Sequence, residues 1–217
     1  MMKKQKNKYS FSGSAVKVLL EKYACPIPYH QLRAQFMGNI ATPIMTVSPM
    51  QEIQRIWDSE LPTFESNSDA EEFFGVLMQG LWNSLSAHQK RADPFKLARI
   101  AMTPASLEFL FKLAKVRRQE IEGFVDGLFA GQGEIDLAES AHKAVGILGE
   151  MRAIFEATEQ LAAQPASVES IAETIRHFQQ MTRIAENEIN VVIQSCKKAR
   201  ARGIAFGFES MNGGSCG

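Results

Sequence analysis

Residues 167–202 read SVESIAETIRHFQQMTRIAENEINVVIQSCKKARAR, and apolar side chains recur along them with a heptad period. With Val168 at position a, every a and d position is apolar except Thr182. The a positions are Val168, Ile175, Thr182, Ile189 and Cys196, and the d positions are Ile171, Phe178, Ala185, Val192 and Ala199. Ser167 suits an N-cap, no Gly or Pro interrupts the stretch, and Gly203 follows as a stop. The pattern predicts one helix of about 54 Å, at 1.5 Å per residue.

Further apolar residues flank this a/d seam in the middle of the helix, among them Ile184 and Val191. A helix that is apolar over about half of its circumference needs more than one neighbour to cover it. Either the first part of the chain covers the excess, or a second copy covers it through a two-fold contact. We expect a homodimer with Ile184 and Val191 at its interface, because they stand one heptad apart and away from the preceding helices.

The first half of the chain predicts short helices and the second half predicts long ones, since seven of the eight prolines lie at or before Pro104. One short helix is expected to end at Gly38, and another to begin with a capping box formed by Ser48 and Gln51. Nothing reads as a strand, so the expected fold class is all-α, with short N-terminal helices packed on a bundle of long antiparallel helices. The expected long helices are 104–130, 137–164 and 167–202. The expected lobes are 11–100 and 101–203, and the expected disordered tails are 1–10 and 204–217.

The composition is that of an ordinary globular protein, with 45% hydrophobic and 22% charged residues. Lys plus Arg and Asp plus Glu number 24 each, so no global charge favours a nucleic acid or an anionic membrane as partner. The three cysteines, Cys25, Cys196 and Cys216, form no CxxC pair and are odd in number, which indicates a reducing compartment. No apolar run approaches the roughly 18 residues of a membrane span. We therefore expect a cytoplasmic protein with no membrane partner and no nucleic-acid partner.

Residues 117–131, RRQEIEGFVDGLFAG, resemble the helix with a GF-x-x-GL core found in the YecA/YgfB-like family of helical bacterial proteins. The next segment, EIDLAESAHKAVGILGEM, and the earlier DAEEFFGVLMQGLWNSLSAH are similar to the neighbouring elements of that family, so the resemblance covers about residues 69–155. It implies an all-helical fold and brings no catalytic residues. Some members of the family carry a C-terminal Cys-rich metal knuckle, but the tail here holds only Cys216, so no metal role is implied.

Few residues have the spacing of a catalytic or metal site. Glu139 and His142 form a Glu-x-x-His unit, which di-iron helical bundles use in duplicate, but only one copy is present. The histidines are scattered, and neither a GxSxG elbow nor a phosphate-binding loop occurs. We therefore expect no cofactor and no metal, with Glu139 and His142 as the weak candidates. The expected function is that of a non-enzymatic interaction or adaptor protein with an unidentified protein partner; the alternative is a protein, catalytic or not, that binds a metal or small ligand between the lobes.

Two groups of cations remain to be explained. Arg117 lies near the inward stripe of its helix, so it needs a partner: either Glu120 in a salt bridge or an anion in a pocket. A basic cluster near the end of the last helix suits either a solvated helix terminus or a contact for RNA or an acidic partner. No aromatic residue is interleaved with it, which weakens the nucleic-acid interpretation. This cluster consists of Lys197, Lys198, Arg200 and Arg202.

Overall fold

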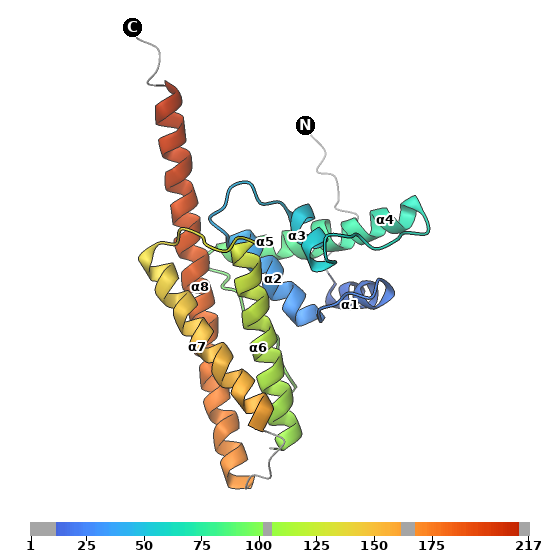
Figure 1. Ribbon diagram of the computed structural model, residues 1–217, viewed down its shortest axis with the longest axis vertical. Helices are drawn as coiled ribbons and strands as arrows, with labels where there is room; N and C mark the ends of the chain where they lie inside the picture. The colour runs from blue at the N-terminus through green and yellow to red at the C-terminus, as the bar shows by residue number, and fades with distance from the viewer. Residues whose placement is uncertain (1–11, 102–105, 162–167, 213–217) are drawn as a thin grey trace.

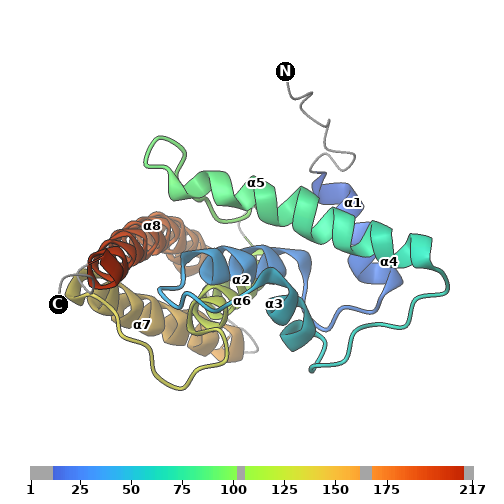
Figure 2. The same cartoon turned by 90° about the horizontal axis from the view of Figure 1, so that it is seen from above.

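The computed structural model describes residues 12–101, 106–161 and 168–212, and within these ranges the fold is all-α without strands, as expected (Figure 1). The expected tail 1–10 lies outside the described residues. A π-helical stretch, Gly75–Trp82, joins α4 (Asn67–Phe74) to α5 (Asn83–Ser86), and a 3-10 turn, Ala87–Gln89, follows, so that residues 67–89 form one continuous helical rod (Figure 2). The α-helices are α1 (Gly13–Lys22), α2 (Tyr29–Ala41), α3 (Pro49–Ile56), α4 (Asn67–Phe74), α5 (Asn83–Ser86), α6 (Leu107–Phe129), α7 (Glu139–Leu161) and α8 (Val168–Asn212).

The long helices α6, α7 and α8 lie side by side, and each runs antiparallel to the one before it (Figure 1). The left-handed conformations of Ala130 (φ 51°) and Gly131 (φ 79°) end α6 at the expected place. The next helix begins two residues later than the expected 137, because the backbone N–H groups of Ala141 and His142 bond to the carbonyl oxygen of Ala138.

The expected a/d seam of α8 is buried from Ile171 to Cys196, apart from the half-buried Thr182. The expected end of this helix was wrong, because α8 continues through Gly203 to Asn212 and is 45 residues long. A glycine inside a helix costs only about 1 kcal/mol relative to alanine, so Gly203 does not stop the helix by itself. Residues 204–212, which were expected in a disordered tail, therefore extend the last helix.

The short helices of the first half of the chain are attached to the bundle by α2, which packs along α6 at very short range. A Cβ atom at Gly38 would lie 2.0 Å from the carbonyl oxygen of Phe124, and one at Gly127 would lie 1.9 Å from that of Gln35. Only glycine permits such an approach of two backbones. The expectation that Gly38 ends its helix was therefore wrong, since α2 runs on to Ala41 and Gly38 is a packing position in its interior.

The short helices around α2 are stabilised by a capping box and by a cluster of aromatic side chains. Ser48 and Gln51 form the expected capping box at the start of α3. Beyond α3, the fully buried ring of Phe73 contacts Tyr23 and Trp57 edge to face, with ring centroids 5.2 and 5.3 Å away. The core is thus continuous from this aromatic cluster through α2 to α6 and α8.

Candidate functional site

Arg117 and Glu120 form a buried ion pair in the middle of α6, with 5% and 0% of their surfaces exposed. The Arg117 guanidinium also donates to Thr182 Oγ1 (3.0 Å) and to the carbonyl oxygen of Ala98 (2.9 Å), while the N–H of Ala98 donates to Glu120 Oε1 (2.6 Å). The expected salt bridge is therefore confirmed, and each of the three guanidinium nitrogens of Arg117 donates to a partner within the protein. Its position in the core makes it structural rather than a contact for a partner.

The buried ion pair is one of several contacts that hold the extended segment 94–101, which precedes α6, against α6 and α8. The backbone N–H of Phe95 donates to Asn190 Oδ1, and Asn190 Nδ2 donates back to the Phe95 carbonyl oxygen, both at 2.9 Å. Glu186 Oε1 accepts from the N–H of Leu97 at 3.1 Å. Side chains of α6 and α8 thus replace a neighbouring strand and satisfy the backbone of this segment. No local sequence pattern predicts these pairs, because the partners are 89 to 95 residues apart.

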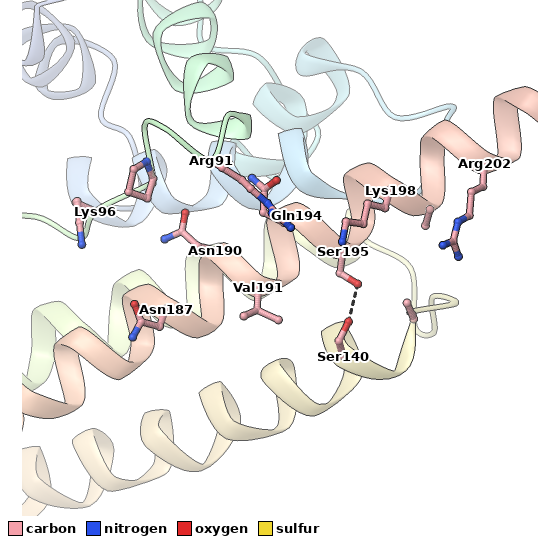
Figure 3. Close-up of a pocket in the computed structure, with 13 residues that line it drawn as sticks. Arg91, Lys96, Ser140, Asn187, Asn190, Val191, Gln194, Ser195, Lys198 and Arg202 are labelled. Carbon is pink, nitrogen blue, oxygen red and sulfur yellow. Dashed lines mark hydrogen bonds between the residues drawn. The ribbon is translucent and has the colours of Figure 1, made fainter.

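A basic groove, here called the α8 groove, lies between the start of this segment, α8 and the start of α7 (Figure 3). It encloses 680 Å³. Four cations line it, and Figure 3 shows them spread along α8 together with amide and hydroxyl side chains. The cations are Arg91, Lys96, Lys198 and Arg202, and the neutral polar residues are Ser140, Asn187, Asn190, Gln194 and Ser195.

A second basic groove of 560 Å³, here called the α6 groove, lies on the other side of the extended segment, between α1, α2 and α6. Lys96 lines both grooves, which therefore adjoin each other. No aspartate or glutamate is among the described residues that line either one. The cations of the α6 groove are Lys17, Arg33, Lys96, Arg99 and Lys112, and Tyr29 and His30 lie among them.

The basic cluster expected at the end of the last helix is not a helix end, because α8 continues past it. Arg200 donates to the Ile40 carbonyl oxygen and to Gln89 Oε1, both at 2.9 Å, so it joins α8 to α2 and to the 3-10 turn. Lys198 and Arg202 instead line the α8 groove. Within this cluster Arg200 is therefore structural, whereas Lys198 and Arg202 are available to a ligand.

An apolar strip lies on the outer face of α7 and α8. Ser140 and Ser195 meet across the two helices at 2.9 Å, and Figure 3 shows Val191 on the same side of α8 as this contact. Ile147 and Ile154 follow Ser140 at intervals of seven residues, and Val191 and Ile184 precede Ser195 by four and eleven, so all four share one face of the hairpin. Their exposed fractions are 39% for Ile147, 48% for Ile154, 40% for Ile184 and 39% for Val191.

The weak metal candidates Glu139 and His142 both lie exposed on the first turn of α7. Glu139 pairs with Lys143 at 2.6 Å. In the described ranges no three His, Cys, Asp or Glu side chains gather into a group that could hold a metal ion. The structure thus brings no further ligand to Glu139 and His142.

Burial shifts the pKa values of Cys25, Cys196 and His30. It raises the pKa of the Cys25 thiol and of the Cys196 thiol to about 11, so both are protonated at neutral pH. Burial also lowers the pKa of His30; the hydrogen bond to Gln119 acts in the opposite direction, and nearby cations, Arg117 first, lower it further. These groups therefore supply neither a thiolate nor an extra cation at neutral pH.

None of the helices in the described part of the chain is long and apolar enough to span a membrane. No protein-family model, curated protein or solved structure matches this chain. The resemblance of residues 69–155 to the YecA/YgfB-like family therefore stays a prediction.

Proposed function

We propose that this chain is a non-enzymatic helical interaction protein that pairs with a second copy through the outer face of α7 and α8. The observation that supports it is the apolar strip, which holds four of the six large apolar side chains exposed in the described residues. Exposed apolar residues scattered singly need no explanation, but a group with heptad spacing on adjacent helices is typical of a helix-packing surface.

A second copy fits this surface in size and symmetry. Each helix of the strip offers a pair of branched side chains seven residues apart, so α7 of one copy can pack against α8 of the other in a two-fold contact that closes. The 23 residues of α7 span about 35 Å, and two helices are about 20 Å wide, which gives a face of about 700 Å². A standard interface buries about 800 Å² per partner.

The length of α8 gives a further reason for a partner. Ser195 lies opposite the first turn of α7, and α8 continues from there to Asn212, about 26 Å further at 1.5 Å per residue. Figure 1 shows this end of α8 standing clear of the other described elements. Isolated helical ends are marginal in water, so this one gains stability from a neighbour.

Light scattering in solution tests the pairing. The wild type should have twice the 24.1 kDa mass of one chain, and I184E/V191E should be a folded monomer, because buried glutamates oppose the contact. The variant I147E/I154E should behave in the same way without touching the α8 groove. The matched control is V18E/M45E, which makes the same change at two exposed positions of the N-terminal lobe and should leave the dimer intact.

A wild type of 24.1 kDa at micromolar concentration would refute the pairing. If the control dissociated like the two strip variants, the interface would lie elsewhere. The alternative function, a ligand held between the lobes, has one observation in its favour: the α6 groove is lined by residues of both lobes.

A further inference from the structure

We propose that the α8 groove and the α6 groove together form a binding site for the phosphodiester backbone of a nucleic acid. Val191 belongs to both the apolar strip and the α8 groove, but none of the cations proposed to bind phosphates is part of the strip. The site also differs from the expectation of no nucleic-acid partner, which rested on the balanced total charge and on the lack of aromatic residues among the cations of the last helix. The cations that line the two grooves come from α1, α2, α6, α8 and the segment that ends at residue 101, so their order in the sequence hides their proximity.

Most of these cations form no ion pair with an acid in the described part of the chain. Lys96 pairs with Glu186 at 3.0 Å, and Arg33 donates to the Lys96 carbonyl oxygen at 2.7 Å and lies over the Phe95 ring. For the other six, no ion pair with an acid is found within the described ranges. The whole chain has equal numbers of acids and bases and therefore no net charge. The clustering of these cations without acids beside them nevertheless produces a local positive potential, which an anion can neutralise. The six are Lys17, Arg91, Arg99, Lys112, Lys198 and Arg202.

The extent of the site favours a chain of phosphates over a single small anion. The α8 groove alone follows α8 from Asn187 to Arg202, about 22 Å at 1.5 Å per residue. Consecutive phosphates of one strand in a duplex are about 3.4 Å apart along the axis, so this length corresponds to about six of them. The α6 groove continues the tract beyond Lys96. A small phosphate compound would reach only a few of these cations at once.

The remaining lining residues favour phosphates over bases and over a protein. Arg, Lys, Ser, Asn and Gln side chains are the usual contacts of nucleic-acid phosphates, and the α8 groove combines all five. No aromatic residue is among the described residues that line it, so bases have no stacking platform there and binding should depend little on sequence. Among those same residues Val191 is the only large aliphatic one, whereas protein interfaces centre on buried aromatic and aliphatic anchors.

The test is the fluorescence anisotropy of a labelled 20-nucleotide RNA, of the same sequence as single-stranded DNA, and of the DNA duplex. If six cations contact phosphates, raising the salt from 50 to 200 mM should weaken binding roughly 300-fold for a single strand and roughly 1,800-fold for a duplex. The variant R91A/K198A/R202A removes three contacts, so its salt effect should fall to roughly 20-fold and 40-fold respectively. The variant K17A/R99A/K112A should show the same reduction if both grooves form one site.

The matched control is R91K/K198R/R202K, which keeps the charge and should keep the salt dependence of the wild type. Circular dichroism should be unchanged in all three variants, because these side chains make no ion pair in the described structure. Binding of RNA alone, DNA alone or both supports the proposal and identifies the source of the phosphates.

Three results would overturn the proposal. The first is no binding of any of the three probes by 10 µM protein at 50 mM salt. The second is equally tight binding of polyglutamate or of phosphatidylserine vesicles, which would indicate an acidic protein or a membrane. The third is an unchanged salt dependence in both alanine variants.

Discussion

Replacing Gly127 by alanine tests the close packing of α6 against α2. The added Cβ atom would lie 1.9 Å from the carbonyl oxygen of Gln35 and 2.9 Å from the backbone nitrogen of Asn39. A carbon atom and a carbonyl oxygen in favourable contact are at least about 3.3 Å apart, so the two helices must move apart by about 1.4 Å. Neither neighbour can rotate away, because both are backbone atoms of α2.

The expected effect is a large loss of stability. Overpacking a core costs about 1 to 3 kcal/mol, and a clash between two backbones lies at the upper end of that range. Alanine is about 1 kcal/mol more favourable than glycine inside a helix, which offsets part of the cost. The net loss is therefore about 2 kcal/mol or more, which corresponds to a fall in Tm of about 4 to 8 °C for a chain of this size.

The same substitution at Gly149 is the matched control, because nothing lies within 4 Å of a Cβ atom there and Gly149 is also inside a long helix. G149A should stabilise the protein by about 1 kcal/mol through helix propensity alone. Urea unfolding followed by circular dichroism measures both variants, and midpoints at two protein concentrations separate folding from self-association. If G127A were as stable as the wild type, or if both substitutions shifted the free energy in one direction, the close approach of α2 and α6 would be refuted.

The variant R117A leaves Glu120 buried without its counter-ion and should lower the free energy of unfolding by about 3 to 5 kcal/mol, with R117M/E120L recovering part of it; a loss below about 1 kcal/mol would contradict the buried pair. In a chain whose other two cysteines are replaced by alanine, Cys196 should react slowly with a thiol reagent at pH 8 and rapidly once the protein is unfolded, because burial raises its pKa to about 11. Burial raises the pKa of Glu52 above its ordinary 4.5, so its contribution to stability is full below that pH and declines as the pH rises through the raised value. The difference in unfolding free energy between the wild type and E52Q should therefore fall from about pH 4 to pH 7, and a rise would contradict this sign.

The amino-acid sequence was sufficient for features that depend on residues close together in the chain. The heptad from Ile171 to Cys196 predicted the buried face of α8, because side chains three and four residues apart share one side of a helix. The capping box of Ser48 and the pairing of Arg117 with Glu120 were predictable for the same reason, since each joins residues within one helical turn. These local patterns also determined the all-α class.

Features that join distant segments were decided by the tertiary structure alone. Glycine is common at helix ends, so the sequence predicts that Gly38 ends its helix. Only the packing of α6 against it makes Gly38 a residue in the interior of α2. The backbone of Phe95 is satisfied by Asn190, 95 residues away, and no local pattern records such a pair. The two basic grooves arise in the same way, because a chain with no net charge acquires a positive surface only when folding brings its cations together and places its acids elsewhere.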